Sequence, residues 1–285
     1  MAGGRSGSPL QDTARATPAP VLRGLVADYH GYRYEGFAPG VHLGMPSPQL
    51  TVVVTLGPDI GFAGTPVPAQ AGSRFAALAS GIAEAPVEIV HDGTQYGMQL
   101  TFTPWGARAL FGIPAGALGP WLVDLGEVLG ADARELRDRA AAAATWPERF
   151  AVLDDVLVRR LRPVDVAPEL REAWRALVTN PRARVGDVAG RVGWSRRTLS
   201  SRFTAEFAVT PKTASRLARF ARSHRLARGE APLAEIAVRC GYADQAHLDR
   251  EWRDLAGVSP TRWRRDEVFP FVQDDDHHVE RDFES

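Results

Sequence analysis

The sequence has few cysteines for covalent cross-links and no long apolar run for a membrane span. Its 285 residues include one cysteine, Cys240, which excludes a disulfide within the chain and is typical of a reducing cytoplasm. We expect this thiol to be buried as a small apolar group rather than to sense oxidants. Because a signal peptide and any apolar run approaching ~20 residues are also lacking, we predict a cytoplasmic protein without a membrane partner.

Sequence motifs of enzymes and metal sites are missing as well. Phosphate-binding glycine loops, nucleophile elbows and acid pairs at catalytic spacing are absent from the sequence. His30, His42 and His91 are widely separated and lack a ligand spacing such as His-x-His, and the pair His277-His278 lies in an acidic tail. We therefore predict neither an enzyme nor a metal or cofactor site.

Basic residues are unevenly distributed along the chain. The net charge is zero, but residues 182–265 contain 18 Arg or Lys against 8 Asp or Glu. Residues 1–181 contain 15 against 18, and residues 266–285 contain 1 against 8. Positive charge concentrated in one segment is the electrostatic pattern of a nucleic-acid-binding domain, although a solvated basic face is the plain alternative.

The basic segment contains the same sequence pattern twice. The first copy spans residues 185–211 and the second spans residues 233–260. Three positions, from Val185 to Gly193, have counterparts 48 positions later, and four further positions, from Leu199 to Pro211, have counterparts 49 positions later. A nearly constant offset over so many positions indicates an internal duplication.

Each copy has the pattern of a helix-turn-helix. Apolar residues at helical spacing predict a short helix, which Gly193 or Gly241 ends, because glycine accepts the left-handed backbone of a C-terminal cap. Ser195 or Asp244 follows and is suited to cap the start of a second helix. The second helix has an apolar inner face and a polar outer face, so it can present a row of polar side chains to a DNA major groove.

Residues 185–265 resemble the tandem helix-turn-helix DNA-binding domain of AraC/XylS-type transcription regulators. The second copy, EIAVRCGYADQAHLDREWRDLAGVSPTRWR, follows that family's C-terminal signature almost throughout. The chain departs from the usual pattern at Trp252 (commonly Phe), at Ala208 (commonly Gly), and at Ser200 and Ser201 (commonly longer polar residues). The resemblance implies a sequence-specific activator or repressor that binds double-stranded DNA. It also implies a small-molecule effector, RNA polymerase and a second copy of the chain as candidate partners.

The candidate DNA contacts lie on the outer face of the second helix of each copy and near the end of the domain. Arg197 and Arg250 are suited to pair with both acceptors of a guanine edge, or to bind phosphate alone. Gln245 is suited to adenine, and His247 to a base edge or a phosphate. Arginines after Pro260 are suited to backbone phosphates, which give affinity without sequence information. The predicted contacts are Arg196, Arg197, Ser200, Ser201, Gln245, His247, Arg250, Arg262 and Arg264.

The N-terminal part of the chain predicts strands followed by helices. Alternating or β-branched patterns indicate strands at residues 29–37, 49–56, 74–82, 86–90 and 95–103, and Asp92-Gly93 is the strongest hairpin signal. Such strands predict a small antiparallel barrel or sandwich. Helical patterns follow at residues 118–129, 131–144 and 147–161, and the apolar stripe of the last helix suits either core packing or a dimer seam.

The predicted fold class is therefore α+β, with a small antiparallel β domain and its helices followed by an all-α tandem helix-turn-helix domain. The predicted organisation is a disordered tail (1–20), a sensor or dimerisation domain (21–162), a linker (163–168), the DNA-binding domain (169–265) and an acidic tail (266–285). The resemblance implies a cupin-like sensor that binds an effector, whose binding residues the sequence leaves unknown. The alternatives are an enzyme whose N-terminal catalytic barrel is tethered to a DNA-binding module, and a constitutive architectural DNA binder.

Overall fold

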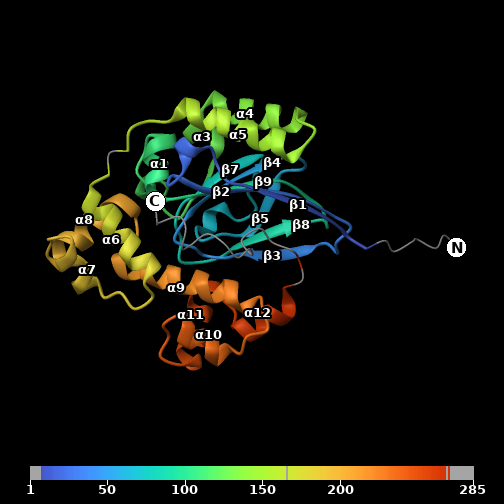
Figure 1. Ribbon diagram of the computed structural model, residues 1–285. Helices are drawn as coiled ribbons and strands as arrows, with labels where there is room; N and C mark the ends of the chain where they lie inside the picture. Colours follow the sequence, from blue (N-terminus) through green and yellow to red (C-terminus); the bar gives the residue numbers. More distant parts are fainter. Residues whose placement is uncertain (1–7, 165, 268, 270–285) are drawn as a thin grey trace.

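The computed structural model describes residues 8–164, 166–267 and 269, and Figure 1 shows a β domain with helices on one side and a helical part next to it. Most of the expected acidic tail, including His277-His278, lies outside these residues. In the part of the chain that is described, no helix is long and apolar enough to cross a membrane.

The N-terminal domain consists of two antiparallel sheets. The six-stranded sheet has the order β1-β2-β9-β4-β7-β10, and the four-stranded sheet has the order β3-β8-β5-β6. The strands of the larger sheet are Leu10–Ala16 (β1), Val26–Glu35 (β2), Gln95–Phe102 (β9), Leu50–Thr55 (β4), Ala77–Ser80 (β7) and Leu122–Asp124 (β10). Those of the smaller sheet are Gly40–Gly44 (β3), Val87–His91 (β8), Ile60–Gly64 (β5) and Arg74–Phe75 (β6).

The centre of the larger sheet is buried on both faces, which explains the β-branched run of β4. Val52 and Val54 of β4 belong to the main core, which continues into the helices. Val53 points the other way, into a second cluster with Phe62 of β5 and Ile89 of β8. Since successive strand residues alternate between the two faces, a strand covered on both sides needs apolar side chains at nearly every position.

Two predictions about the tail and strands of this domain are wrong. Residues 10–16 are not disordered, because they form β1 and pair with β2 in register from Leu10↔Glu35 to Ala16↔Tyr29. The turn at Asp92-Gly93 exists, with Gly93 at φ 98°, but it does not join a hairpin. The strand before it, β8, pairs with β3 and β5, whereas the strand after it, β9, pairs with β2 and β4 in the other sheet.

Helices follow the sheets and cover one face of the larger sheet (Figure 1). They are Pro104–Phe111 (α1), Ala115–Leu118 (α2), Leu125–Leu129 (α3), Ala131–Ala142 (α4) and Trp146–Arg160 (α5), and two short 3-10 turns lie at Pro20–Leu22 and Pro68–Gln70. Helix α5 begins with a capping box between Thr145 and Glu148, and its apolar stripe, from Phe150 to Leu157, is buried in the core. The predicted helix at 118–129 is wrong, because β10 interrupts that segment.

The C-terminal part is helical throughout. Its helices are Pro168–Thr179 (α6), Val185–Arg191 (α7), Arg196–Phe207 (α8), Pro211–Ala227 (α9), Leu233–Arg239 (α10), Gln245–Ala256 (α11) and Pro260–Asp266 (α12). Figure 1 shows α9 as the connection between a lobe containing α6 to α8 and a lobe containing α10 to α12. The two lobes correspond to the two copies of the duplicated sequence.

Candidate nucleic-acid interface

The two copies share the same turn geometry. Gly193 and Gly241 have φ values of 72° and 81°, as expected for glycines that end α7 and α10. In each copy the residue after the glycine closes the turn, because Trp194 N donates to Ala189 O and Tyr242 N donates to Ala237 O, both at 2.9 Å. The predicted helix-turn-helix geometry is therefore confirmed in both copies.

The second helix of each copy begins and packs as predicted. Ser195 accepts a hydrogen bond from Thr198 N at 3.1 Å, and Asp244 accepts one from His247 N at 2.7 Å. The inner face of α8 buries Leu199 and Phe203, and that of α11 buries Leu248 and Trp252. We call α8 and α11 the recognition helices, because this packing leaves their opposite faces outward.

The structure also explains how α11 accepts tryptophan at position 252. The indole Nε1 of Trp252 donates to Ser223 Oγ at 2.8 Å, and this hydroxyl in turn donates to Phe220 O at 2.8 Å. Trp252 and Ser223 are both fully buried, so the indole N–H has a partner where water cannot reach it.

Several predicted DNA contacts are exposed on the outer faces and available to a ligand. Arg197 on α8 and Gln245 and Arg250 on α11 are exposed, and none has a hydrogen bond or an ion pair with another described residue. Ser201 is exposed and Ser200 is half-buried. An arginine without a protein partner retains all five N–H donors for base edges or phosphates.

Other predicted contacts are held by the protein itself. The guanidinium of Arg196 packs against Gly186 of α7. It is so close that a Cβ added at Gly186 would lie 2.3 Å from Nη2 of Arg196. The Nδ1 atom of His247 accepts a hydrogen bond from Ala243 N at 3.3 Å, so Nε2 is the ring nitrogen left for DNA. Arg262 pairs with Asp266 at 3.2 Å on the surface.

The structure gives Arg264 a different role from the predicted one. Its Nε donates to Ala227 O at 2.6 Å and its Nη2 donates to Ala231 O at 2.8 Å. These carbonyls belong to the end of α9 and the loop after it, where a cation satisfies free acceptors. Arg264 therefore joins α12 to α9, and the prediction that it serves as a phosphate contact does not fit this geometry.

A buried carboxylate that sequence reasoning missed connects α9 to α11. Glu251 is 5 % exposed and accepts hydrogen bonds from Arg219, at 2.8 Å to Oε2, and from Arg216, at 3.3 Å. In the sequence, the only sign of this role is that Glu251 lies between Arg250, which faces outward, and Trp252, which faces inward.

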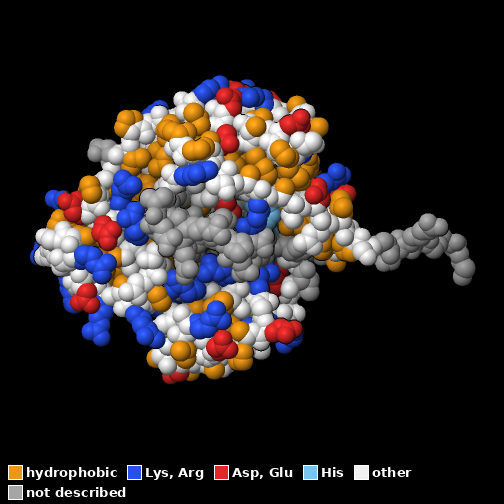
Figure 2. All heavy atoms as spheres, viewed as in Figure 1, with side chains coloured by type: hydrophobic (Ala, Val, Ile, Leu, Met, Phe, Trp, Pro, Cys, Tyr) orange, Lys and Arg blue, Asp and Glu red, His pale blue; other side chains and the backbone are white. Residues whose placement is uncertain are grey.

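A basic groove lies beside this cluster and is lined by Lys212, Arg216, Arg219, His247 and Arg250, among others. Figure 2 shows arginine and lysine side chains over the lower left of the molecule, where Figure 1 places α7 to α11.

The helical part contacts the N-terminal domain at several places. Arg108 on α1 donates two hydrogen bonds to Glu206 on α8, each at 2.7 Å, which is the bidentate geometry of a strong ion pair. Nearby, a Cβ added at Gly116 of α2 would lie 3.1 Å from the backbone oxygens of Ala205 and Glu206. The α2 and α8 backbones therefore approach closely at this contact.

Two further contacts involve α9 and Phe269, which follows α12. Glu84, in the loop between β7 and β8, accepts hydrogen bonds from Thr213 and Arg216 of α9, both at 3.3 Å. Beyond α12, the ring of Phe269 packs on His42 and His91, with centroid distances of 5.0 and 4.0 Å. Burial lowers the pKa of His42 to about 3, so this histidine is neutral beside the phenylalanine.

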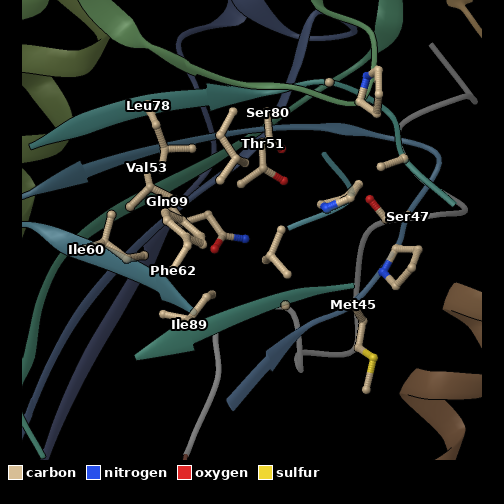
Figure 3. Close-up of a pocket in the computed structure, with 18 of the residues that line it drawn as sticks. Met45, Ser47, Thr51, Val53, Ile60, Phe62, Leu78, Ser80, Ile89 and Gln99 are labelled. Atoms are coloured by element: carbon tan, nitrogen blue, oxygen red, sulfur yellow. The ribbon is translucent and has the colours of Figure 1, made fainter. Parts of the chain in front are cut away.

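A second candidate site is the cavity between the two sheets (Figure 3). The space between its walls is about 800 Å³ when the open solvent at its mouth is included, and the centres of water-sized molecules can occupy about 90 Å³ of it. They come from β4, β7 and β9 of the larger sheet, from β5 and β8 of the smaller sheet, and from the loops around Met45 and Ala83. Among the described residues no cluster of histidine, cysteine or carboxylate side chains could hold a metal ion.

Cys240 is fully buried, as predicted, at the end of α10. Burial raises the pKa of its thiol to about 11, so the thiol is protonated at neutral pH. This keeps it a packing residue.

Comparisons with known proteins gave one matching family model and several similar solved structures. The model of the helix-turn-helix domain family matches residues 188–266. The C-terminal domain of AraT, a response regulator from Geobacillus stearothermophilus, is 24% identical over 40% of this chain and 98% of its own, with a TM-score of 0.35. An AraC-type regulator from Chromobacterium violaceum is 25% identical over 34% of this chain and 90% of its own, with a TM-score of 0.33. ToxT from Vibrio cholerae is 12% identical over 90% of this chain and 97% of its own, with a TM-score of 0.47. No curated protein matches the chain.

Proposed function

We propose that this chain, whose residues 188–266 are an AraC-type helix-turn-helix domain, is a transcription regulator that binds DNA through α8 and α11. The observation that supports this most strongly is the pair of recognition helices, each with an exposed arginine that has no partner among the described residues. Two such helices in one chain would enter successive faces of the major groove, about 34 Å or one helical turn apart. Arg197, Gln245 and Arg250 would contact base edges.

The N-terminal domain would bind a small-molecule effector in the cavity between its sheets. Cavities lined mainly by apolar side chains, with a few polar groups, are the usual form of small-molecule sites. The protein would act in the cytoplasm, with RNA polymerase and a second copy of the chain as further candidate partners.

The cavity is placed so that its contents would affect both recognition helices. Ala83 and Ala85 line it on either side of Glu84, which binds Arg216, and Arg216 in turn binds Glu251 on α11. Gly81 also lines the cavity and touches Gly119, next to the helix α2 that packs on α8. An effector that moves residues 80–85 would therefore change contacts to α8 and to α11.

Binding of the full chain to a fluorescent random-sequence DNA duplex tests the DNA-binding proposal. Affinity should fall steeply as salt rises from about 50 mM to about 200 mM, since neutralised phosphates release counterions. Arg197→Ala and Arg250→Ala each remove a positive charge next to the duplex and should weaken binding even to random DNA, whereas Arg134→Ala should leave it unchanged. Arg134 is the matched control, because it is an exposed arginine without a described partner on α4 of the other domain.

Two results would contradict the proposal. One is a folded protein that does not bind DNA at low salt. The other is a loss of affinity in Arg134→Ala as large as that in the recognition-helix variants.

A further inference from the structure

A glutamine amide faces the cavity between the sheets, and no described residue forms a hydrogen bond with it. Gln99, in the middle of β9, is 5 % exposed and makes no hydrogen bond with any described residue. It pairs in register with Val53 of β4, so both side chains lie on the face that looks toward the smaller sheet. Figure 3 shows its amide directed into the cavity among apolar side chains.

The hydrogen bonds of this amide must be made to whatever occupies the cavity, because no described residue supplies them. An apolar molecule that displaced water from the cavity would leave the amide without a partner, which is unfavourable, so a bound molecule needs a polar group that pairs with it. Leucine or methionine at this position would complete the apolar surface formed by Val53, Phe62 and Ile89. The presence of an amide there points to a bound molecule that supplies the missing partner.

The polar groups around Gln99 are all uncharged. Thr51 and Ser80 face each other in register on neighbouring strands, line the same cavity, and have no hydrogen-bond partner among the described residues. Tyr32, Ser47, Gln49 and Gln95 complete the polar lining, and the described lining residues include no Asp, Glu, Lys, Arg or His. An ionised group held against this lining and away from water would therefore have no counter-charge, which is unfavourable.

We infer that the cavity takes an uncharged, mainly apolar molecule with a polar group that both donates and accepts hydrogen bonds, such as a carboxamide. The Gln99 side chain offers one carbonyl oxygen and one NH2 group, so it can pair with such a group in both directions. The apolar part of the molecule would lie against Phe62, Leu78 and Ile89. This inference rests on the proposed effector role of the N-terminal domain and specifies the chemical class of its ligand.

Three probes of similar size and different charge test the ligand class: benzamide, benzoate and benzylamine. Their affinities for the full chain are measured at neutral pH by ligand-observed NMR titration into the millimolar range. Benzamide should bind at least tenfold more tightly than either charged probe. In Gln99→Leu the affinity for benzamide should fall about tenfold, while the protein remains folded because the amide has no described protein partner to lose and leucine is similar in size.

Gln11→Leu is the matched control, since Gln11 is exposed on β1 and does not line the cavity. It should bind all three probes as the wild type does. Leu78→Trp provides a second variant, because an indole at this wall residue should fill the cavity and abolish benzamide binding.

Charged probes that bind as tightly as benzamide, or a Gln99→Leu variant that retains the preference, would overturn the inference. Absence of benzamide binding to the wild type would also overturn it. DNA binding by the same preparations is measured in parallel, so that a failure of the ligand class can be told from a failure of the proposed function. A wrong ligand class with DNA binding intact overturns this inference alone, whereas absence of DNA binding overturns the proposed function.

Discussion

The residue that follows α8 allows a test of stability, and the equivalent residue after α11 allows the reverse test. Ala208 follows this helix with φ 60° and is the one non-glycine residue with positive φ in the described chain. A left-handed backbone costs an L-residue such as alanine about 1–2 kcal/mol, and replacement by glycine removes this cost. Glycine also has more conformational freedom in the unfolded chain, which takes back about 0.5–1 kcal/mol of that gain. We therefore predict that Ala208→Gly raises the free energy of unfolding by about 0.5–1 kcal/mol.

The second copy carries the reverse experiment. Gly257 ends α11 at the position 49 residues later, with φ 71°, and no atom lies within 4 Å of a Cβ added there. Gly257→Ala would therefore introduce backbone strain without a steric clash. It should lower the free energy of unfolding by about the amount that Ala208→Gly adds.

Urea unfolding followed by tryptophan fluorescence measures both changes. The midpoints should move in opposite directions while the slope m stays constant, since neither substitution alters the surface exposed on unfolding by much. The methyl group of Ala208 is exposed, so its removal leaves no cavity. A lower midpoint for Ala208→Gly, or an unchanged one for Gly257→Ala, would refute the reasoning from backbone conformation.

Three further outcomes follow from particular contacts. Gly241→Val should lower the free energy of unfolding by about 2 kcal/mol, because φ is 81° there and an added Cβ would lie 3.1 Å from Pro181. A variant that unfolds at the same temperature as the wild type would refute the role of Gly241 as a cap. Arg264→Ala should lower the free energy of unfolding by about 2 kcal/mol through the loss of its hydrogen bonds to Ala227 and Ala231. Arg265 is exposed, so Arg265→Ala should leave the free energy of unfolding unchanged. An Arg264→Ala variant that binds DNA more weakly but is as stable as the wild type would contradict this role. Burial lowers the pKa of His224 to about 3, so the folded protein keeps it neutral while the unfolded chain protonates it near pH 6.5. Stability should therefore fall as pH drops from 6.5 toward 3, by up to about 1.4 kcal/mol per unit, and His224→Phe should reduce that dependence in urea titrations at each pH.

The features that the sequence predicts well are those encoded by local chemistry. Gly193 and Gly241 are left-handed caps, and Ser195 and Asp244 are N-caps, because each of these roles depends on one residue and its immediate neighbours. The duplication reinforced the interpretation, since every cap appears twice.

The features that the sequence does not predict depend on distant partners. Strand β1 lacks an apolar pattern because its hydrogen bonds to β2, rather than buried side chains, hold it in place. Asp92-Gly93 specifies a turn but not which sheet each flanking strand joins. The role of Arg264 is set by carbonyls 33 and 37 positions earlier in the chain.

The cavity could have left one trace in the sequence. Gln99 interrupts the apolar character of β9 between Met98 and Leu100. A polar residue at an inward position of a strand is a signal of a buried site, but the alternation alone does not show that the inward face encloses a space.

Selection of bound sequences from a random DNA pool tests the central claim most directly. The full chain and its Arg197→Ala and Arg250→Ala variants are each used to recover duplexes, which are then sequenced. The account predicts a wild-type motif with two groups of specified bases about one helical turn apart, and a relaxed preference at one base position, with a loss of about 1–3 kcal/mol, in each variant. Recovery of no motif by the wild type, or the same motif at uniformly lower affinity with both variants, would contradict base recognition by these two arginines.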